Sequence, residues 1–240
     1  QSPQRRIFLP MLVTTGAPSS QNPLHSGEAT YYDTADGRGN CSFDATPDDL
    51  MVAAISYLDY GNPDPNNRPE DGPAAVYCGA TVEVYGPNGT IRVRIVDKCP
   101  DVYVPPSSGC AKGHLDLSPQ AFAKIAPLER GRVKITWRVI SPELGRPIAY
   151  KIHEDANQWW TAIQVRHHRN PIVKLEYRNS AGEWVPMVRQ DWNYFIDSNM
   201  GPGPYTLHVT DAYGNVLQDS GIPLVPGGEF AGAGQFPPGP

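Results

Sequence analysis

The sequence predicts a protein built mostly of short β-strands and divided into two domains. It has 240 residues, among them 23 glycines and 26 prolines, and only 19% of its residues are charged. This composition favours short strands joined by tight turns over a helical protein. Many segments also alternate between apolar and polar residues, which is the pattern of a half-buried strand. We therefore expect a mainly β fold.

The first domain is expected over residues 27–141, after a Pro-rich segment, 1–26, that lacks periodicity and predicts a flexible arm. Strands are predicted in GEATYY, MVAAIS, TVEVYGPNGTIRVRIVD and GRVKITWRVI. The third of these consists of two alternating halves around a Pro-Asn-Gly turn, so it predicts a β-hairpin. Only SPQAFAKIA predicts a helix, with Ser118 as N-cap and Pro119 at the first helical position.

A second domain is expected over residues 146–240, because the preceding segment SPELGRP has the composition of a linker. Short alternating segments follow, from IAYKIHE to NVLQDSGIP, and turn residues separate them. About six or seven strands in fewer than about 100 residues predict a β-sandwich. The Gly/Pro-rich C-terminal tail carries Phe230 and Phe236, which can pack back onto a domain.

Charge and cysteine content limit the partners and the compartment. The net charge is -5 and the isoelectric point is about 5.7, so no basic field attracts nucleic acid or a membrane surface. The four cysteines have no C-x-x-C spacing, which predicts two disulfides and secretion into an oxidising, extracellular compartment. Three pairings are possible from sequence alone. Among them we favour Cys41–Cys78 and Cys99–Cys110.

Two aspartates lie where apolar segments end, and they are candidates for chemistry. Asp97 belongs to VRIVDKCP and Asp116 to GHLDLSPQAF. An aspartate before a turn more often accepts hydrogen bonds from nearby backbone N–H groups than it reacts. Asp116 is the stronger candidate because its flanking leucines tend to raise the pKa of the carboxyl, as a general acid requires.

These motifs resemble those of the expansins. GEATYY, VDKCP, HLDLSPQAF and KITWRV occur in this order in the family, and the resemblance continues through WWTAIQVRHH to the terminal GQFP. It covers residues 27 to about 240 and is greatest for the two-domain bacterial members. It implies a six-stranded double-psi β-barrel, similar to that of family-forty-five glycoside hydrolases, followed by an immunoglobulin-like β-sandwich that is a carbohydrate-binding module.

The resemblance also implies a function. Such a protein is a secreted monomer that binds cellulose and associated plant cell-wall glucans, and that loosens contacts between wall polysaccharides without net hydrolysis. It implies no cofactor and no metal. Asp116 matches the acidic residue that corresponds to the general acid of the hydrolases and is needed for wall loosening. Thr30 and Asp97 match polar residues of the same groove, where they can position the carboxyl of Asp116 and a sugar hydroxyl.

Two positions depart from the family pattern. The best-matching bacterial pattern has a groove tyrosine where this chain has Cys99, and the disulfide explains the exchange. Tyr32 or Tyr103 can supply an aromatic side chain instead. Expansins typically lack the base carboxylate that inverting hydrolysis places about 6.5–9.5 Å from the acid. Asp33 falls where the related hydrolases keep that base, although it is more simply part of the polar turn DTADGRG.

Three alternative functions follow from these residues. The first is a weak endoglucanase with Asp116 as acid and Asp33 as base. The second is a lytic transglycosylase that acts on peptidoglycan, since related barrels do this. The third is a cellulose-binding protein with an inert barrel.

Adjacent tryptophans, Trp159 and Trp160, begin a strand-like segment of the second domain. Neighbouring strand side chains point to opposite faces, so one indole would be buried unless the chain leaves regular pleating through a bulge or twist. The family binds cellulose through three aromatic residues in a row, and the third position matches Trp192. Because exposed aromatic planes stack on the C–H faces of sugar rings, these three side chains predict a coplanar cellulose-binding platform.

Basic residues near this platform can attract acidic cell-wall polymers. Lys151 is a candidate ligand for them, whereas His153 stands where the family has a lysine. Acidic residues outnumber basic ones in the second domain, so we expect weak binding to acidic matrix polysaccharides. The run from Arg166 to Arg169 contains two adjacent histidines, which on a strand face opposite ways. It therefore predicts a solvated basic strand end and not a metal site.

Overall fold

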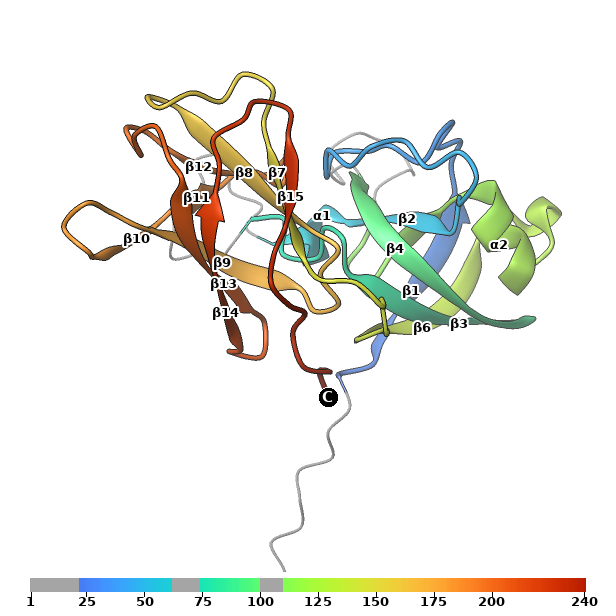
Figure 1. The fold of residues 1–240 in the computed structure, drawn as a ribbon. Coiled ribbons are helices and arrows are strands. Elements are labelled where there is room, and N and C mark those ends of the chain that lie inside the picture. The colour runs from blue at the N-terminus through green and yellow to red at the C-terminus, as the bar shows by residue number, and fades with distance from the viewer. Residues whose placement is uncertain (1–21, 62–73, 100–109) are drawn as a thin grey trace, which may run out of the picture.

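The computed structural model describes residues 22–61, 74–99 and 110–240, and it contains two β-rich parts that lie side by side (Figure 1). The first part is a closed barrel with the strand order β1-β5-β2-β4-β3-β6. A closed barrel leaves no strand edge exposed. This is the predicted six-stranded double-psi barrel. Its strands are β1 (His25–Tyr31), β2 (Val52–Ser56), β3 (Thr81–Gly86), β4 (Gly89–Cys99), β5 (Leu115–Leu117) and β6 (Val133–Ile140).

The hairpin of β3 and β4 shows how alternation builds the barrel. Val82 and Val84 are fully buried in β3, while Thr81, Glu83 and Tyr85 lie on the opposite face and are half-buried, as period-two alternation requires. In the pairing register Gly86 lies opposite Gly89, so Pro87 and Asn88 form the turn. The predicted Pro-Asn-Gly hairpin is therefore confirmed.

The predicted helix is α2 (Pro119–Ile125), and it covers one side of the barrel. Ser118 is its N-cap, with its Oγ accepting a hydrogen bond of 3.0 Å from the N–H of Ala121. The side chains of Phe122 and Ile125 are fully buried against the barrel core. The structure also has, in its described part, two short helices that were not predicted, α1 (Tyr57–Tyr60) and η2 (Leu128–Arg130). Among the described residues no helix is long and apolar enough to cross a membrane.

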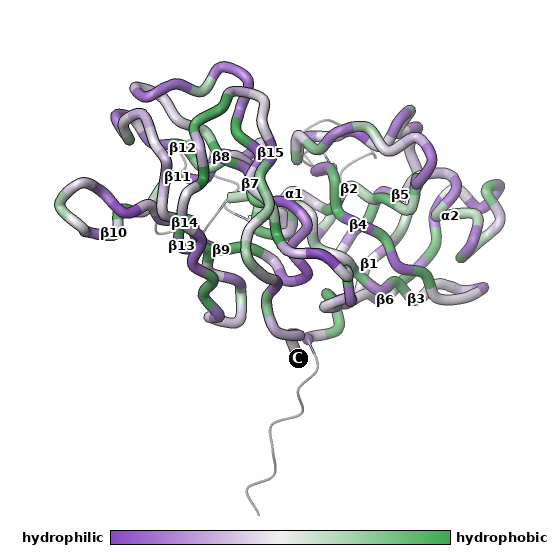
Figure 2. The backbone as a smooth tube through the Cα atoms, viewed as in Figure 1, coloured by the Kyte–Doolittle hydropathy of each residue, from purple (hydrophilic) through white to green (hydrophobic). Residues whose placement is uncertain are grey.

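The second part is a β-sandwich of two sheets, as predicted. One sheet has the order β10-β9-β13-β14 and the other β11-β12-β8-β7-β15. Figure 2 shows apolar residues along the strands of both parts and hydrophilic residues in many connecting loops. The strands are β7 (Ala149–Ile152), β8 (Thr161–Arg166), β9 (Ile172–Arg178), β10 (Trp184–Pro186), β11 (Val188–Arg189), β12 (Phe195–Asp197), β13 (Tyr205–Asp211), β14 (Val216–Ile222) and β15 (Glu229–Ala231).

Both ends of the described chain are anchored. The C-terminal segment supplies β15, which pairs with β7, and Phe236 is almost fully buried while Phe230 packs against the sandwich core. At the other end β1 begins at His25, and the Asn22 side chain donates a hydrogen bond of 2.9 Å to the carbonyl of Val139. Residues 22–26 of the segment predicted as an arm therefore belong to the fold, and residues 1–21 lie outside the described residues.

The strand β8 corrects one expectation from the sequence. All six of its residues are buried, because one face lies in the sandwich core and the other packs on the barrel. Arg166 is buried at this junction, and its guanidinium pairs with Asp44 at 2.5 Å and with Glu229 at 2.9 Å. The predicted solvated basic strand end is therefore wrong. The charged guanidinium of Arg166 can stay buried because the carboxylates of Asp44 and Glu229 compensate its charge.

His168 is also buried at the junction. Burial lowers its pKa to about 3, so its ring is neutral at neutral pH, and Nδ1 lies 2.8 Å from the carbonyl oxygen of Asn170. A carbonyl only accepts, so Nδ1 carries the proton and donates it.

Two disulfides complete the fold. Cys41 is bonded to Cys78, with 5.5 Å between their Cα atoms, and Cys99 is bonded to Cys110. Both predicted pairings are confirmed. The first bridge links the loop after β1 to the segment before β3, beside the sandwich. The second links the end of β4 to the segment before β5.

Candidate functional site

Strand register brings three predicted residues together on the outside of the barrel. In the parallel pair of β1 and β5, Thr30 lies opposite Asp116. Asp116 in turn lies opposite Ala54 of β2, which pairs with Asp97 of β4. Leu115 and the other neighbour of Asp116 point into the core, so the carboxyl points outward. We call the row of Thr30, Asp116 and Asp97 the polar strip.

A chain of hydrogen bonds fixes the carboxyl of Asp116. The hydroxyl of Thr30 donates to Asp116 Oδ1 at 2.6 Å, and His114 Nε2 lies 2.8 Å from the same hydroxyl oxygen. Because the single Thr30 proton goes to the carboxylate, His114 Nε2 donates. Burial lowers the pKa of His114 to about 4, so the imidazole is neutral at neutral pH.

The electrostatic surroundings of Asp116 fit a proton donor. Burial raises the pKa of its carboxyl, and the negative charge of Asp97 raises it further. The Thr30 hydrogen bond and the positive charge of Arg132 oppose these effects. The net shift is upward, because desolvation is the largest contribution, as expected for a half-buried carboxyl flanked by leucines.

Asp97 is held by the backbone around it. Its Oδ1 accepts hydrogen bonds from the N–H of Asn40 at 2.7 Å and from the N–H of Lys98 at 2.8 Å. The backbone at Gly39 passes so close that a Cβ there would lie 2.5 Å from Asp97 Cβ, so no larger residue fits. Tyr32 donates to the other oxygen at 3.4 Å. Sequence patterns showed the aspartate but not this backbone cradle.

Tyr32 is the aromatic residue of the polar strip. It packs against the disulfide of Cys99 and Cys110, and burial raises the pKa of its phenol, with further contributions from the charges of Asp97 and Asp116. Tyr103, the other candidate, lies outside the described residues. Cys99, Cys110 and His114 form a group of potential metal ligands in the described part of the chain, but the disulfide leaves no free thiolate there.

Asp33 lies in a turn beyond the end of β1. Its side chain is exposed, and Oδ1 accepts a hydrogen bond of 2.9 Å from the N–H of Ala35. This is the arrangement of an Asx turn, in which the carboxylate caps its own backbone. The second carboxylate of the polar strip is thus Asp97, and a role for Asp33 as base stays a prediction.

The two adjacent tryptophans do not lie on regular strand. The backbone groups of Asn157 and Trp160 bond to each other in both directions, at 2.8 and 3.1 Å, which encloses a two-residue turn with Trp159 at its tip. The Asn157 side chain caps this turn, accepting from the N–H of Trp159 at 2.9 Å and of Trp160 at 3.2 Å. Trp159 is 66% exposed and Trp160 is half-buried. Neither indole belongs to the core, and a turn, not a bulge, is the reason.

Trp192 comes from a second turn, between β11 and β12, and His153 joins it to Trp160. The imidazole meets the rings of Trp160 and Trp192 nearly edge-on, with centroid distances of 5.3 and 5.5 Å, and Tyr194 at 5.2 Å. Edge-to-face contacts of this kind hold aromatic rings in fixed orientation. We call Trp159, Trp160 and Trp192 the tryptophan platform. The sequence signalled these tryptophans but not the supporting His153 and Tyr194.

The side chain of Lys151 forms a hydrogen bond with the backbone. Its Nζ donates to the carbonyl of Gly227 at 2.7 Å, and the side chain is half-buried. The predicted role of Lys151 toward acidic polymers stays a prediction.

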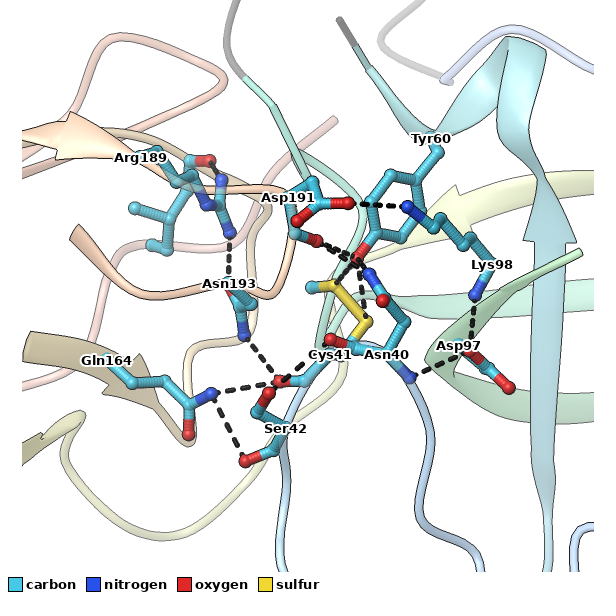
Figure 3. Close-up of a disulfide and its surroundings, with 12 residues drawn as sticks. Asn40, Cys41, Ser42, Tyr60, Asp97, Lys98, Gln164, Arg189, Asp191 and Asn193 are labelled. Carbon is cyan, nitrogen blue, oxygen red and sulfur yellow. Dashed lines mark hydrogen bonds and ion pairs between the residues drawn. A yellow bond between two sulfur atoms is a disulfide. The ribbon is translucent and has the colours of Figure 1, made fainter. Parts of the chain in front are cut away.

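Contacts of Asp191 connect the turn that carries Trp192 to the backbone around Asp97, and Figure 3 shows Asp191 beside Asn40, Tyr60 and Lys98. The carbonyl of Asp191, the residue before Trp192, accepts hydrogen bonds from the Asn40 side chain at 2.8 Å and from the Tyr60 hydroxyl at 2.6 Å. The Asp191 carboxylate pairs with Lys98 Nζ at 2.5 Å. Asn40 and Lys98 are the residues whose N–H groups hold Asp97. We call this set of contacts the Asp191 junction.

The disulfide segment beside the Asp191 junction carries a second set of contacts between the two parts (Figure 3). The carbonyl of Cys41 accepts from the side chains of Gln164 at 2.9 Å and Asn193 at 3.3 Å. Asn193 in turn accepts at 2.7 Å from the buried guanidinium of Arg189. Because Asn193 directly follows Trp192, the platform turn is fixed on both sides of its tryptophan.

Comparisons with known proteins agree with this geometry. A family model described as lytic transglycolase matches residues 25–137. The chain is 35% identical over 212 residues to Expansin-YoaJ of Bacillus subtilis (strain 168), covering 88% of this chain and 83% of that protein. The crystal structure of an expansin from Clavibacter michiganensis superimposes with a TM-score of 0.76 at 31% identity, covering 90% of this chain and 99% of the other. The same values hold for a substituted form of that expansin in complex with cellohexaose.

These similarities extend over both the barrel and the sandwich. The chain therefore belongs to the expansin family, as the resemblance of its motifs implied.

Proposed function

We propose that this expansin is secreted, binds cellulose through the tryptophan platform, and loosens non-covalent contacts between plant cell-wall polysaccharides without net hydrolysis. The observation that carries the proposal is the Asp191 junction, which fixes the platform turn to the backbone that cradles Asp97. Two binding surfaces held in a fixed relation raise the effective concentration of each for its own chain. The cellohexaose complex of a related expansin supports a glucan as ligand, and the two disulfides support secretion.

The polar strip can compete for the hydroxyls that join neighbouring glucans. Hydrogen bonds between neutral groups contribute about 0.5–1.5 kcal/mol, whereas those to charged groups contribute about 1.5–3 kcal/mol. A chain that leaves its neighbour for the Asp116 carboxylate therefore exchanges neutral hydrogen bonds for stronger ones. The platform keeps the protein on the surface while this exchange takes place.

Non-hydrolytic action fits the state of the carboxylates. Asp116 has the raised pKa of a general acid, but hydrolysis also needs a base that is free to take a proton from water. The carboxylate of Asp97 is occupied by two backbone N–H groups and that of Asp33 by its own turn. A weak endoglucanase is the second candidate, because the raised pKa of Asp116 suits the acid step of that reaction.

The experiment compares wild type, Asp116→Asn and a matched control, Asp48→Asn, which removes an exposed carboxylate from the same barrel. Three readouts are taken: creep of wall strips under constant load, retention on cellulose, and release of reducing ends from soluble glucan. We expect Asp116→Asn to reduce creep at least roughly tenfold, the factor that corresponds to 1.4 kcal/mol. Its retention should stay within about twofold of wild type, with no reducing ends released by any variant.

Results that differ from these expectations would support one of the alternative functions. Sustained release of reducing ends that Asp116→Asn abolishes would establish an endoglucanase. Solubilisation of peptidoglycan without new reducing ends would establish a lytic transglycosylase, since that reaction closes an anhydro ring instead of adding water. Undiminished creep by Asp116→Asn would make the barrel inert.

A further inference from the structure

The outward-facing row of the barrel continues beyond Thr30. Glu28 lies two residues earlier on β1, hence on the same face of the strand, and it is opposite Lys134 of β6. Arg132 donates to Glu28 Oε2 at 2.7 Å. The positive charge of Arg132 also lowers the pKa of Asp116. The polar strip and the segment that precedes β6 are therefore electrostatically connected.

A basic cavity of about 400 Å³ opens at this segment. None of its lining residues is acidic. Arg132 shares its charge with Glu28, whereas Arg130 and Lys134 form no ion pair with any described residue. The helix α2, which leads into the segment, lies on the side of the barrel away from the sandwich (Figure 1). The lining consists of Pro87, Asn88, Ala126, Pro127, Arg130, Arg132, Val133 and Lys134.

Charge thus changes sign along the face of the molecule. Asp97 and Asp116 in the polar strip are acidic, Asp191 at the junction is paired with Lys98, and the cavity at the far end is basic. A polymer with a carboxylate on every ring would place like charges against the aspartates, which is unfavourable. A neutral chain with one isolated carboxylate avoids this repulsion and still meets the cations. The net charge of -5 provides no general attraction for either.

We propose that the cavity lined by Arg130, Arg132 and Lys134 is a subsite for the carboxylate of a uronic acid residue on an otherwise neutral glycan that lies along the polar strip. The inference rests on the proposed function for the path of the glycan. Guanidinium groups match carboxylates with two parallel hydrogen bonds, and Lys134 adds a point charge. Exposed ion pairs contribute little each, so the subsite selects between chains and adds little to overall binding.

The test measures affinity by calorimetry for cellohexaose and for cellohexaose with one glucuronosyl ring at either end. Both modified ends are needed because the direction of the chain decides which end meets the cavity. We expect the intact protein to prefer one acidic form by roughly three- to twentyfold at low salt, with the preference shrinking at high salt. Arg130→Gln/Lys134→Gln should lose this preference, while its affinity for cellohexaose stays within about twofold.

The matched control is Lys174→Gln/Arg178→Gln, which removes two positive charges from β9 of the sandwich. It should keep the preference for the acidic form. Equal affinity of the intact protein for all three oligosaccharides overturns the subsite and leaves the proposed function in place. Equal loss in the control also overturns it, since the effect would then come from net charge. If cellohexaose itself does not bind, the proposed glucan ligand fails, and preference for the acidic form alone then supports the subsite.

Discussion

The polar strip and the tryptophan platform are built by different means. Thr30, Asp116 and Asp97 come from three strands, and the pairing register places them in one row. Trp159 and Trp192 come from two turns, which are fixed by side chains such as Asn157 that bond to the backbone. Strand register depends on the whole barrel, whereas a turn depends on one or two residues. Side chains of the polar strip can therefore be replaced without moving the backbone. The position of the platform tryptophans, in contrast, depends on turn-capping side chains such as Asn157.

The largest expected effect comes from removing the tryptophan platform. Each indole should contribute about 1–2 kcal/mol of buried apolar surface and stacking, so replacing all three with alanine should weaken cellulose binding on the order of 10²- to 10⁴-fold. Depletion isotherms on crystalline cellulose measure this. The carboxyl titration of Asp116, followed by NMR, should stay as in wild type, because the strip is built on the barrel alone.

The matched control for this variant is Trp184→Ala. Trp184 stacks on His208 in the sandwich, with ring centroids 3.3 Å apart, and lies outside the tryptophan platform. Its loss should leave cellulose binding within about threefold of wild type, a difference of less than 1 kcal/mol. Equal weakening by Trp184→Ala would mean that the platform has no special role.

The difference between local sequence patterns and strand register explains which features of the polar strip the sequence could predict. The apolar neighbours of Asp116 and the alternation of β3 and β4 are local patterns, and strand geometry converts them directly into an outward carboxyl and a hairpin. The position of Asp97 at the end of an apolar segment marked it as a candidate, and resemblance to expansins supplied Thr30 and placed both residues in the groove of Asp116. The register that unites them is a property of the closed barrel, and no local pattern encodes it.

Other features lay beyond local patterns for the same reason. The sequence predicts a solvated basic end for β8, but Arg166 at that end is buried where it pairs with Asp44 of the barrel part. The Asn157 turn uses no glycine or proline, the residues that usually mark turns in a sequence. The Asp191 junction joins residues from both parts of the chain, so only the assembled structure could place Asn40 and Lys98 against Asp191.

The second prediction uses pH to separate the two surfaces. The polar strip contains titratable carboxyl groups, whereas the indoles of the tryptophan platform do not titrate. Burial raises the pKa of Asp116, and its charged carboxylate forms the stronger hydrogen bonds to sugar hydroxyls, so creep should rise by up to roughly tenfold per pH unit below that pKa and level off above it. The fold should meanwhile lose stability as pH rises through this pKa, since the folded state disfavours the charged carboxyl. Cellulose retention should stay flat over the same range.

Two variants should move this pH limb in opposite directions. Thr30→Val removes a hydrogen bond that stabilises the carboxylate, so the pKa of Asp116 should rise and the limb should move to higher pH. Asp97→Asn removes a repulsive charge, so the pKa should fall and the limb should move to lower pH. Creep profiles normalised to their own maxima, together with NMR titration, measure both shifts. Movement of the two limbs in the same direction would contradict this electrostatic account.

The smallest expected effect concerns the Asp191 junction, where strip and platform meet. The pair of Lys98 and Asp191 is partly solvent-exposed, so Lys98→Gln should lower the free energy of unfolding by less than about 1 kcal/mol. Cellulose retention should not change, because the tryptophans remain. Creep should fall roughly two- to fivefold if the two surfaces work as one unit, since the bonds of Asn40 and Tyr60 to Asp191 still hold the turn in part.

The double variant Lys98→Gln/Asn40→Ala removes two of the side-chain contacts with Asp191 at once. It leaves the backbone N–H groups on Asp97 but removes the side-chain contacts of both residues with Asp191, so creep should fall further than in Lys98→Gln while retention stays constant. Arg92→Gln is the control, because it removes the exposed partner of an ion pair with Glu83 that does not involve the junction. A creep rate equal to wild type in the double variant would show that the Lys98 and Asn40 contacts do not couple the strip to the platform. The coupling would then rest on the contacts that remain, from Tyr60 to Asp191 and from Gln164 and Asn193 to Cys41.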